Sequence, residues 1–269
     1  MGHRALIFDS GMGGLSVTEH IRAHMPGLSL TYVADDMFRP YGTKSAAALR
    51  ARLPGLLATL EIATRPDIIV LACNTASVTA LEDIRAAVHA PVVGVVPAVK
   101  PAALTSRTRT LAVLGTPGTV KRKYVDDLIE NFAGDCRVLL QGSTALVALA
   151  EDKMSGRGVD MDILRREVAP LFEGRFGADI DTVVLACTHF PLLIDELKQI
   201  SRQTVNWIDS GEAIARRVTS LLSDMPENRR MEPPDCALLI GPDAEPARRK
   251  VFAQYGFENV VGLYPSKKI

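Results

Sequence analysis

Two cysteines occupy the same place in two similar stretches of the chain. One stretch is DIIVLACNT, residues 67–75, and the other is DTVVLACTH, residues 181–189, so each cysteine follows an aspartate by six residues. The apolar, β-rich run before each cysteine is typical of a buried parallel strand. Ligands of open α/β sheets bind at the carboxyl ends of such strands. The repeat therefore predicts a binding site with one thiol from each half of the chain.

Cys73 and Cys187 suit proton transfer at carbon better than attack by a single nucleophile. A cysteine at a strand end beside a helix N-terminus is expected to have a lowered pKa, so one thiol can be ionised while its partner stays protonated. Two such groups on opposite faces of one carbon remove a proton from one side and return one from the other, which inverts the carbon. A cysteine hydrolase that uses Cys187 and His189 would leave Cys73 without a role. Cys136 and Cys236 each precede an apolar run and are predicted to be small buried residues.

A glycine-rich loop, DSGMGG at residues 9–14, follows the first predicted strand and leads into a helix from about Leu15. Ser16 stands where the dinucleotide-binding fingerprint requires a glycine, so that fingerprint is absent. One interpretation is that the loop's backbone amides hold an anion such as a carboxylate, while Asp9 is free to face a ligand. The alternative is a tight turn in which one or more glycines have a positive φ.

The order of predicted elements repeats once along the chain. In each half a strand, a glycine-containing loop, a helix and a second strand precede the cysteine-bearing strand, which a helix and a last strand follow. This order predicts an α/β fold of two similar parallel-sheet lobes related by pseudo-symmetry, with the active site in the cleft between them. We expect the first lobe to comprise residues 1–97 and 210–269, including a tail strand at 237–240, and the second lobe to comprise residues 98–209. The predicted strands of the two halves are 5–8, 28–33, 67–72 and 92–96, then 110–114, 137–140, 181–186 and 205–208.

The composition excludes several classes of function. The 269 residues include 31 Lys and Arg and 31 Asp and Glu, so the neutral net charge predicts no nucleic-acid partner. No apolar run reaches the roughly 18 residues of a membrane span, and a strand from residue 5 leaves no room for a signal peptide. We therefore expect a cytoplasmic protein. The four cysteines form no CxxC pair, so neither a disulfide framework nor a metal site is predicted.

Several segments, in order, resemble the motifs of the glutamate racemases, within the aspartate/glutamate racemase superfamily. They are FDSGMGGLSV at 8–17, PYGTKS at 40–45, ACNTAS at 72–77, ACTHFP at 186–191 and the pair Asp209-Ser210. Ala186 stands where a glycine is common in that family, which is a change from one small residue to another. The resemblance spans residues 5 to about 225, and the tail beyond it offers no motif.

The resemblance implies a cofactor-independent, metal-free isomerase that interconverts L- and D-glutamate, supplies D-glutamate for bacterial peptidoglycan and forms a homodimer. It implies that Cys73 acts on the D-enantiomer and Cys187 on the L-enantiomer, with Asp9 and His189 assisting proton transfer. Glu151 resembles a family glutamate near the site, although a solvated helix position is equally open. The residues expected to bind the substrate's carboxylates and amine are Ser10, Tyr41, Gly42, Asn74, Thr75, Thr116, Thr119 and Thr188.

Two other functions remain open at this point. An aspartate or hydantoin racemase of the same superfamily would keep the fold and both cysteines, and would differ in the size of its pocket. The residue pairs at 41–42 and 188–189 favour glutamate. A non-catalytic two-lobe binding protein would also have a cleft, but it leaves Asp9, Asn74 and His189 unexplained.

Overall fold

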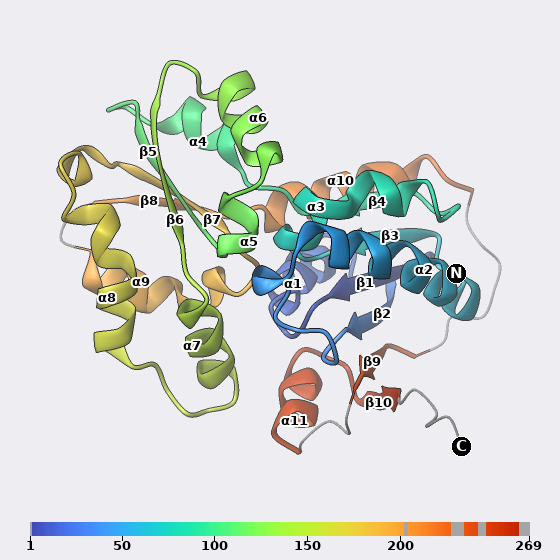
Figure 1. The fold of residues 1–269 in the computed structure, drawn as a ribbon. Coiled ribbons are helices and arrows are strands. Elements are labelled where there is room, and N and C mark those ends of the chain that lie inside the picture. Colours follow the sequence, from blue (N-terminus) through green and yellow to red (C-terminus); the bar gives the residue numbers. More distant parts are fainter. Residues whose placement is uncertain (1, 202–203, 227–233, 242–245, 264–269) are drawn as a thin grey trace.

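Two parallel sheets form the framework of the protein in a computed structural model, which describes residues 2–201, 204–226, 234–241 and 246–263 (Figure 1). The first sheet has the strand order β10-β9-β2-β1-β3-β4 and the second has the order β6-β5-β7-β8. Every described strand pair is parallel. The strands are β1 Arg4–Asp9, β2 Ser29–Ala34, β3 Ile68–Leu71, β4 Val92–Gly94, β5 Thr110–Gly115, β6 Arg137–Gly142, β7 Thr182–Ala186, β8 Asn206–Ile208, β9 Cys236–Ile240 and β10 Asn259–Leu263.

The two sheets share one strand order once β9 and β10 are set aside. The order β2-β1-β3-β4 in the first sheet corresponds to β6-β5-β7-β8 in the second, and the cysteine-bearing strands β3 and β7 occupy the same place. This arrangement confirms the predicted α/β fold with two similar parallel-sheet lobes. We propose that the chain crosses between the lobes near residues 97 and 210, because the strands on either side of each point belong to different sheets.

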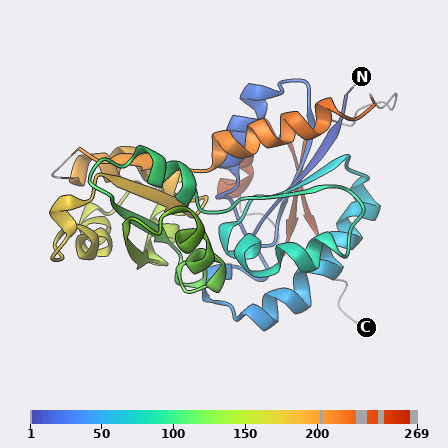
Figure 2. The ribbon, with the colours of Figure 1, turned by 90° about the horizontal axis from the view of Figure 1, so that it is seen from above.

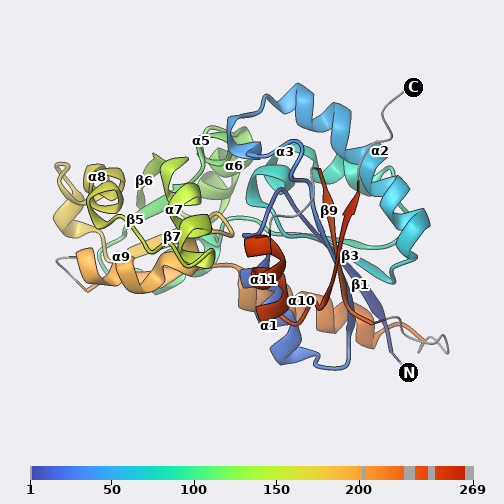
Figure 3. The same ribbon diagram turned by 90° about the horizontal axis from the view of Figure 1, so that it is seen from below.

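Helices cover both faces of the first sheet, as Figures 2 and 3 show from opposite sides. Successive side chains of a strand point to opposite faces. Ala5 and Ile7 of β1 therefore pack under α1, α10 and α11, while Leu6 and Phe8 pack under α2 and α3. These helices are α1 Leu15–His24, α2 Ala46–Thr64, α3 Asn74–Arg85, α10 Gly211–Ser223 and α11 Pro246–Gln254, and the short turn η1 is Tyr41–Thr43.

The second sheet is covered in the same way. Ala112 and Leu114 of β5 pack against α7, α8 and α9, while Leu111 and Val113 face α4 and α6. Burial on both faces accounts for the continuous apolar sequence of the central strands. The elements of this lobe are α4 Val99–Thr105, α5 Pro117–Val120, α6 Lys123–Phe132, α7 Ala145–Met154, α8 Met161–Phe172, α9 Ile194–Ile200, η2 Gly177–Asp179 and η3 Phe190–Leu193.

The tail returns to the first lobe, as predicted. Strand β9 pairs with β2 in parallel and β10 pairs with β9, so the tail extends the first sheet by two strands. The fully buried ring of Phe252 in α11 packs edge-on against Tyr32, with the ring centroids 5.3 Å apart, and Phe257 lies 5.8 Å from the same tyrosine. Neither α11 nor β10 was predicted from the sequence.

Cys136 and Cys236 are half-buried, which corrects the prediction that both are buried. Cys136 precedes β6, an edge strand whose residues are all partly or fully exposed, and Cys236 begins β9, on which buried and half-buried residues alternate. All four cysteines are free thiols. Within the described part of the chain, no helix is both long and apolar enough to cross a membrane. The same residues contain no cluster of three or more His, Cys, Asp or Glu side chains placed to hold a metal ion.

Candidate active site

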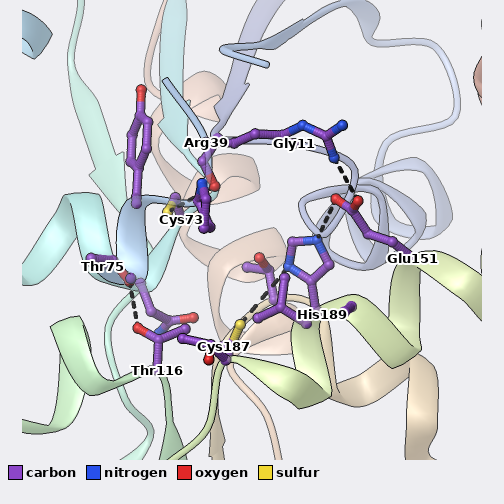
Figure 4. A pocket seen from close by; sticks show the side chains of 17 residues that line it. Gly11, Arg39, Cys73, Thr75, Thr116, Glu151, Cys187 and His189 are labelled. Atoms are coloured by element: carbon purple, nitrogen blue, oxygen red, sulfur yellow. Dashed lines mark hydrogen bonds and ion pairs between the residues drawn. The ribbon is translucent and has the colours of Figure 1, made fainter. Parts of the chain in front are cut away.

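A pocket of about 310 Å³ lies between the lobes, beside the carboxyl ends of β1, β3, β5 and β7 (Figure 4). Cys73 enters it from the first lobe and Cys187 from the second, so the pocket has a thiol from each half of the chain. Asp9 and Thr119 do not line the pocket and lie buried beside lining residues. The other predicted residues that line it are Ser10, Tyr41, Gly42, Asn74, Thr75, Thr116, Glu151, Thr188 and His189.

Cys73 lies between the end of β3 and the start of α3, where its side chain is buried. Its Sγ is 3.8 Å from the Ser10 hydroxyl oxygen. Burial, and then the charge of Asp9, raise the pKa of the Cys73 thiol well above its ordinary value. The lowering predicted from the helix N-terminus is therefore wrong for this cysteine, because desolvation of the thiolate outweighs the nearby backbone amides.

The Asp9 carboxylate binds the glycine-rich loop that follows it. The backbone amides of Ser10 and Gly14 each donate to this carboxylate at 2.7 Å. Two of the loop amides predicted to hold an anion thus hold the protein's own carboxylate, and both oxygens of Asp9 are occupied by them. Burial raises the pKa of Asp9, an effect that the nearby charge of His189 opposes.

Gly13 explains why this loop needs glycine. The positive-φ glycines of the described residues are at 156, 158, 241 and 256, so the alternative of a positive-φ turn in this loop is also wrong. A Cβ at Gly13 would lie 2.3 Å from His189 Nδ1 and 2.7 Å from the Thr188 hydroxyl oxygen. The glycine therefore allows the second lobe to approach the first.

Cys187 forms a chain of contacts with His189 and Glu151. Its Sγ lies 3.9 Å from His189 Nδ1, and His189 Nε2 lies 3.5 Å from Glu151 Oε1. Burial alone would lower the pKa of His189, but its contacts with Cys187 and Glu151 and the charge of Asp9 raise this pKa to about 10. Burial likewise opposes ionisation of Glu151, yet His189, Arg39 and Arg248 lower its pKa to about 2. His189 and Glu151 are therefore both charged at neutral pH.

Arg39 and Arg248 are site residues that sequence reasoning missed. Arg39 lines the pocket and donates to Glu151 at 2.6 Å. Arg248, in the tail helix α11, pairs with Asp36 at 2.5 Å and lies 3.9 Å from Glu151. Arg39 directly precedes a recognised motif, which was the available signal, whereas nothing in the tail sequence indicated a contact with this pocket.

A group of hydroxyls joins the lobes on another wall. The Thr75 hydroxyl is 2.9 Å from those of Thr116 and Thr119, which are 3.1 Å from each other. Asn74 lines the pocket at the start of α3, and its buried Nδ2 has no hydrogen-bond partner. A buried amide without a partner is costly, so this group is available to a ligand.

A partly buried ion pair, Asp35 with Arg52, holds the Tyr41 hydroxyl. Its hydroxyl donates to Asp35 at 2.6 Å, and Asp35 also accepts two bonds from Arg52, at 2.6 and 2.7 Å. The hydroxyl is therefore occupied. The backbone amides of Tyr41 and Gly42, at the start of η1, have no partner within their own turn.

The fold and the site define a two-lobed α/β protein in which two cysteines from equivalent strand ends share one pocket. The model of the Asp/Glu/Hydantoin racemase family matches residues 13–218, and the chain belongs to this family.

The most informative relatives are glutamate racemases. The chain is 44% identical over 235 residues to "Glutamate racemase" of Shewanella sp. (strain ANA-3), covering 87% of this chain and 85% of that protein. It is 44% identical over 255 residues to the protein of the same name from Sphingopyxis alaskensis, covering 95% of each. The fold is similar to Escherichia coli glutamate racemase solved with L-glutamate and the activator UDP-MurNAc-ala, with a TM-score of 0.90, 38% identity, and 98% and 99% of the two chains covered. It is also similar to the Thermus thermophilus glutamate racemase solved with beta-chloro-D-alanine, with a TM-score of 0.76, 27% identity and 97% of each chain covered.

Proposed function

We propose that this protein is a glutamate racemase, an isomerase that interconverts L- and D-glutamate by proton transfer at Cα. One observation carries the proposal: two buried cysteines, at equivalent places in a duplicated fold, line one pocket. The relatives named glutamate racemase, at 44% identity over most of the chain, support glutamate as the substrate. The product D-glutamate is a building block of bacterial peptidoglycan.

In the proposed reaction from L-glutamate, Cys187 is the base and Cys73 is the acid. The Cys187 thiolate takes the α-proton, the electron pair of the broken C–H bond stays on the substrate, and the Cys73 thiol protonates Cα from the other face. Two observations support this assignment: burial keeps Cys73 protonated, and the charged His189 lies beside the Cys187 sulfur. From D-glutamate the two cysteines exchange roles. Asp9, beside Cys73, and His189, beside Cys187, assist these transfers.

The substrate is held by neutral donors in this proposal. The Asn74 amide, the Thr188 hydroxyl and the hydroxyl group formed by Thr75, Thr116 and Thr119 offer donors to one carboxylate. The backbone amides of residues 41–42 offer donors to the other carboxylate, and the Ser10 hydroxyl oxygen, whose proton faces Asp9, is an acceptor for the ammonium group. Donors fixed before the substrate arrives stabilise the negative charge that develops when the α-proton leaves.

Two alternative functions fit the same pocket. An aspartate or hydantoin racemase would use the same cysteines, and a non-catalytic binding protein would use the same pocket without chemistry. The glutamate racemases among the relatives favour neither alternative, and a non-catalytic protein would leave the charged histidine beside Cys187 without a role. A homodimer stays a prediction of the family resemblance, and a cytoplasmic location stays a prediction from the sequence.

The test follows the circular dichroism of each glutamate enantiomer without added cofactor, after treatment with EDTA. Both enantiomers should converge on the racemate, and aspartate should have the lower kcat/KM because its shorter side chain cannot reach both carboxylate sites. Cys73→Ser and Cys187→Ser should each lose roughly 10²-fold or more of the activity, while Cys136→Ser and Cys236→Ser should keep it. Wild-type racemisation by either pocket variant would disprove the two-base scheme, and recovery of chelated enzyme only with metal would disprove a metal-free reaction.

A further inference from the structure

Arg39 lines the pocket and reaches across to Glu151 of the other lobe (Figure 4). It belongs to the loop after β2 in the first lobe, and Glu151, its partner at 2.6 Å, belongs to α7 in the second lobe, 112 positions further along the chain. The Arg39 side chain is 39% exposed and that of Glu151 is 19% exposed. The pair therefore lies at the rim, where it is partly shielded from solvent.

Glu151 uses its two oxygens for different partners. Oε2 accepts from Arg39, while Oε1 lies 3.5 Å from His189 Nε2, and the other nitrogen of His189 faces Cys187 at 3.9 Å. Removing Arg39 would take away the nearest partner of Oε2 and leave only Arg248, at 3.9 Å, so the carboxylate would be held less firmly toward His189. Arg39 is thus the outer end of a series of contacts that leads to the Cys187 sulfur.

Asp36 and Arg248 support Arg39 in this position. Asp36 Oδ1 lies 3.6 Å from Arg39 Nε and accepts from Arg248 at 2.5 Å, and Arg248 lies 3.9 Å from Glu151. The side chains of Asp36 and Arg248 are each only 10% exposed, so this end of the cluster is nearly desolvated. The two arginines thereby balance the charges of the Asp36 and Glu151 carboxylates. The four residues come from three separate segments of the chain.

We propose that Arg39 is a positioning residue of this reaction: it fixes the Glu151 carboxylate toward His189, and His189 in turn lies beside the Cys187 sulfur. The inference rests on the proposed function and adds a residue that acts through Glu151 without touching the reacting carbon. It also predicts an asymmetry. Cys73 faces Ser10 and Asp9 on the other wall, and neither residue contacts Arg39. Loss of Arg39 should therefore impair the Cys187 half of the site selectively.

To test this asymmetry, the assay must follow a reaction that needs only one of the two bases. The two enantiomers of glutamate are equally stable, so kcat/KM must be equal in the two directions for every variant. A β-chloroalanine avoids this constraint, because a thiolate removes the α-proton, the C–H electron pair forms a C=C bond and chloride leaves. The aminoacrylate then hydrolyses to pyruvate and ammonia. In Arg39→Met, pyruvate formation from β-chloro-L-alanine should fall roughly tenfold or more, while formation from β-chloro-D-alanine should match the wild type.

Two further measurements separate positioning from a merely structural role. Without Arg39 the pKa of Glu151 should rise from its low value, so the acid limb of the elimination rate with the L-analogue should move to higher pH in Arg39→Met and stay near the wild type in Arg39→Lys. The charged groups that face Glu151 are His189, Arg248 and Asp36, and they are unchanged in both variants. Arg165→Met, which breaks an exposed Arg–Asp contact of 2.9 Å on α8, is the matched control and should leave both eliminations unchanged.

Equal loss of both eliminations, or no loss of either, would overturn the role of Arg39. A fall in Tm with an unmoved pH profile would likewise assign Arg39 a structural role. These outcomes are distinct from failure of the proposed function, in which the two pocket cysteine variants would racemise glutamate like the wild type.

Discussion

Gly13 sets the distance between the two lobes at His189, and Gly13→Ala should show its importance. The new Cβ would lie 2.3 Å from His189 Nδ1 and 2.6 Å from Cε1. Restoring an ordinary van der Waals separation requires the imidazole to move by roughly 1 Å. The ring is only 4% exposed and is held between Cys187 and Glu151, so the shift must disturb at least one of these contacts.

The expected consequence is a loss of kcat without loss of folding. A misplacement of about 1 Å at a reacting group can cost about 10²-fold in rate, which corresponds to about 2.7 kcal/mol in the activation barrier. Racemisation of L-glutamate, followed by circular dichroism, should therefore fall about a hundredfold. A thermal melt of the same sample should show that the variant is folded.

Gly55→Ala is the matched control for this experiment. Gly55 lies in α2 with no atom within 4 Å of its added Cβ. The variant should keep full activity and gain about 0.5–1 kcal/mol of stability from the better helix propensity of alanine. A Gly13→Ala enzyme that is folded and as active as the Gly55→Ala enzyme would refute the reasoning, because the lobes would then adapt without moving the histidine.

Two further predictions concern stability. Because the pKa of His189 is raised from 6.5 to about 10, the stability that its protonated form contributes is fully present below pH 6.5 and is lost as pH rises through 10. Glu151→Gln lacks one cause of the raised pKa, so thermal melts of this variant should show a smaller loss of stability between pH 7 and 10. An unchanged loss would contradict the pairing of His189 with Glu151. Phe252→Ala removes a fully buried ring from α11, so urea denaturation should show a loss of about 3–5 kcal/mol in the free energy of unfolding, whereas Val261→Ala on β10, which is 47% exposed, should change it by less than about 0.5 kcal/mol.

The duplicated fold could be predicted from the sequence because its signals are local. A continuous apolar run before a cysteine indicates a buried parallel strand wherever that run occurs, and the order of such runs repeated in both halves. The strand predicted over 5–8 lies within β1, and the predicted tail strand pairs with β2. The positions of Cys73 and Cys187 at strand ends follow from the same local pattern.

The states of the site residues depended on contacts between segments that are far apart in the sequence. The helix N-terminus predicted a lowered pKa for Cys73, but the depth of burial decided the opposite. The loop amides predicted to hold a ligand instead hold Asp9, since the loop folds back onto the strand end that precedes it.

The sequence by itself determined two parallel-sheet lobes and a thiol at an equivalent strand end of each. Only the tertiary structure showed that Arg39 and Arg248 join Glu151 beside the pocket. Arg39, Glu151 and Arg248 come from the first lobe, the second lobe and the tail, and no local pattern links them. Secondary structure follows from short-range periodicity, whereas electrostatics in a cleft follow from how whole lobes pack, and the packing brings together residues that the sequence keeps apart.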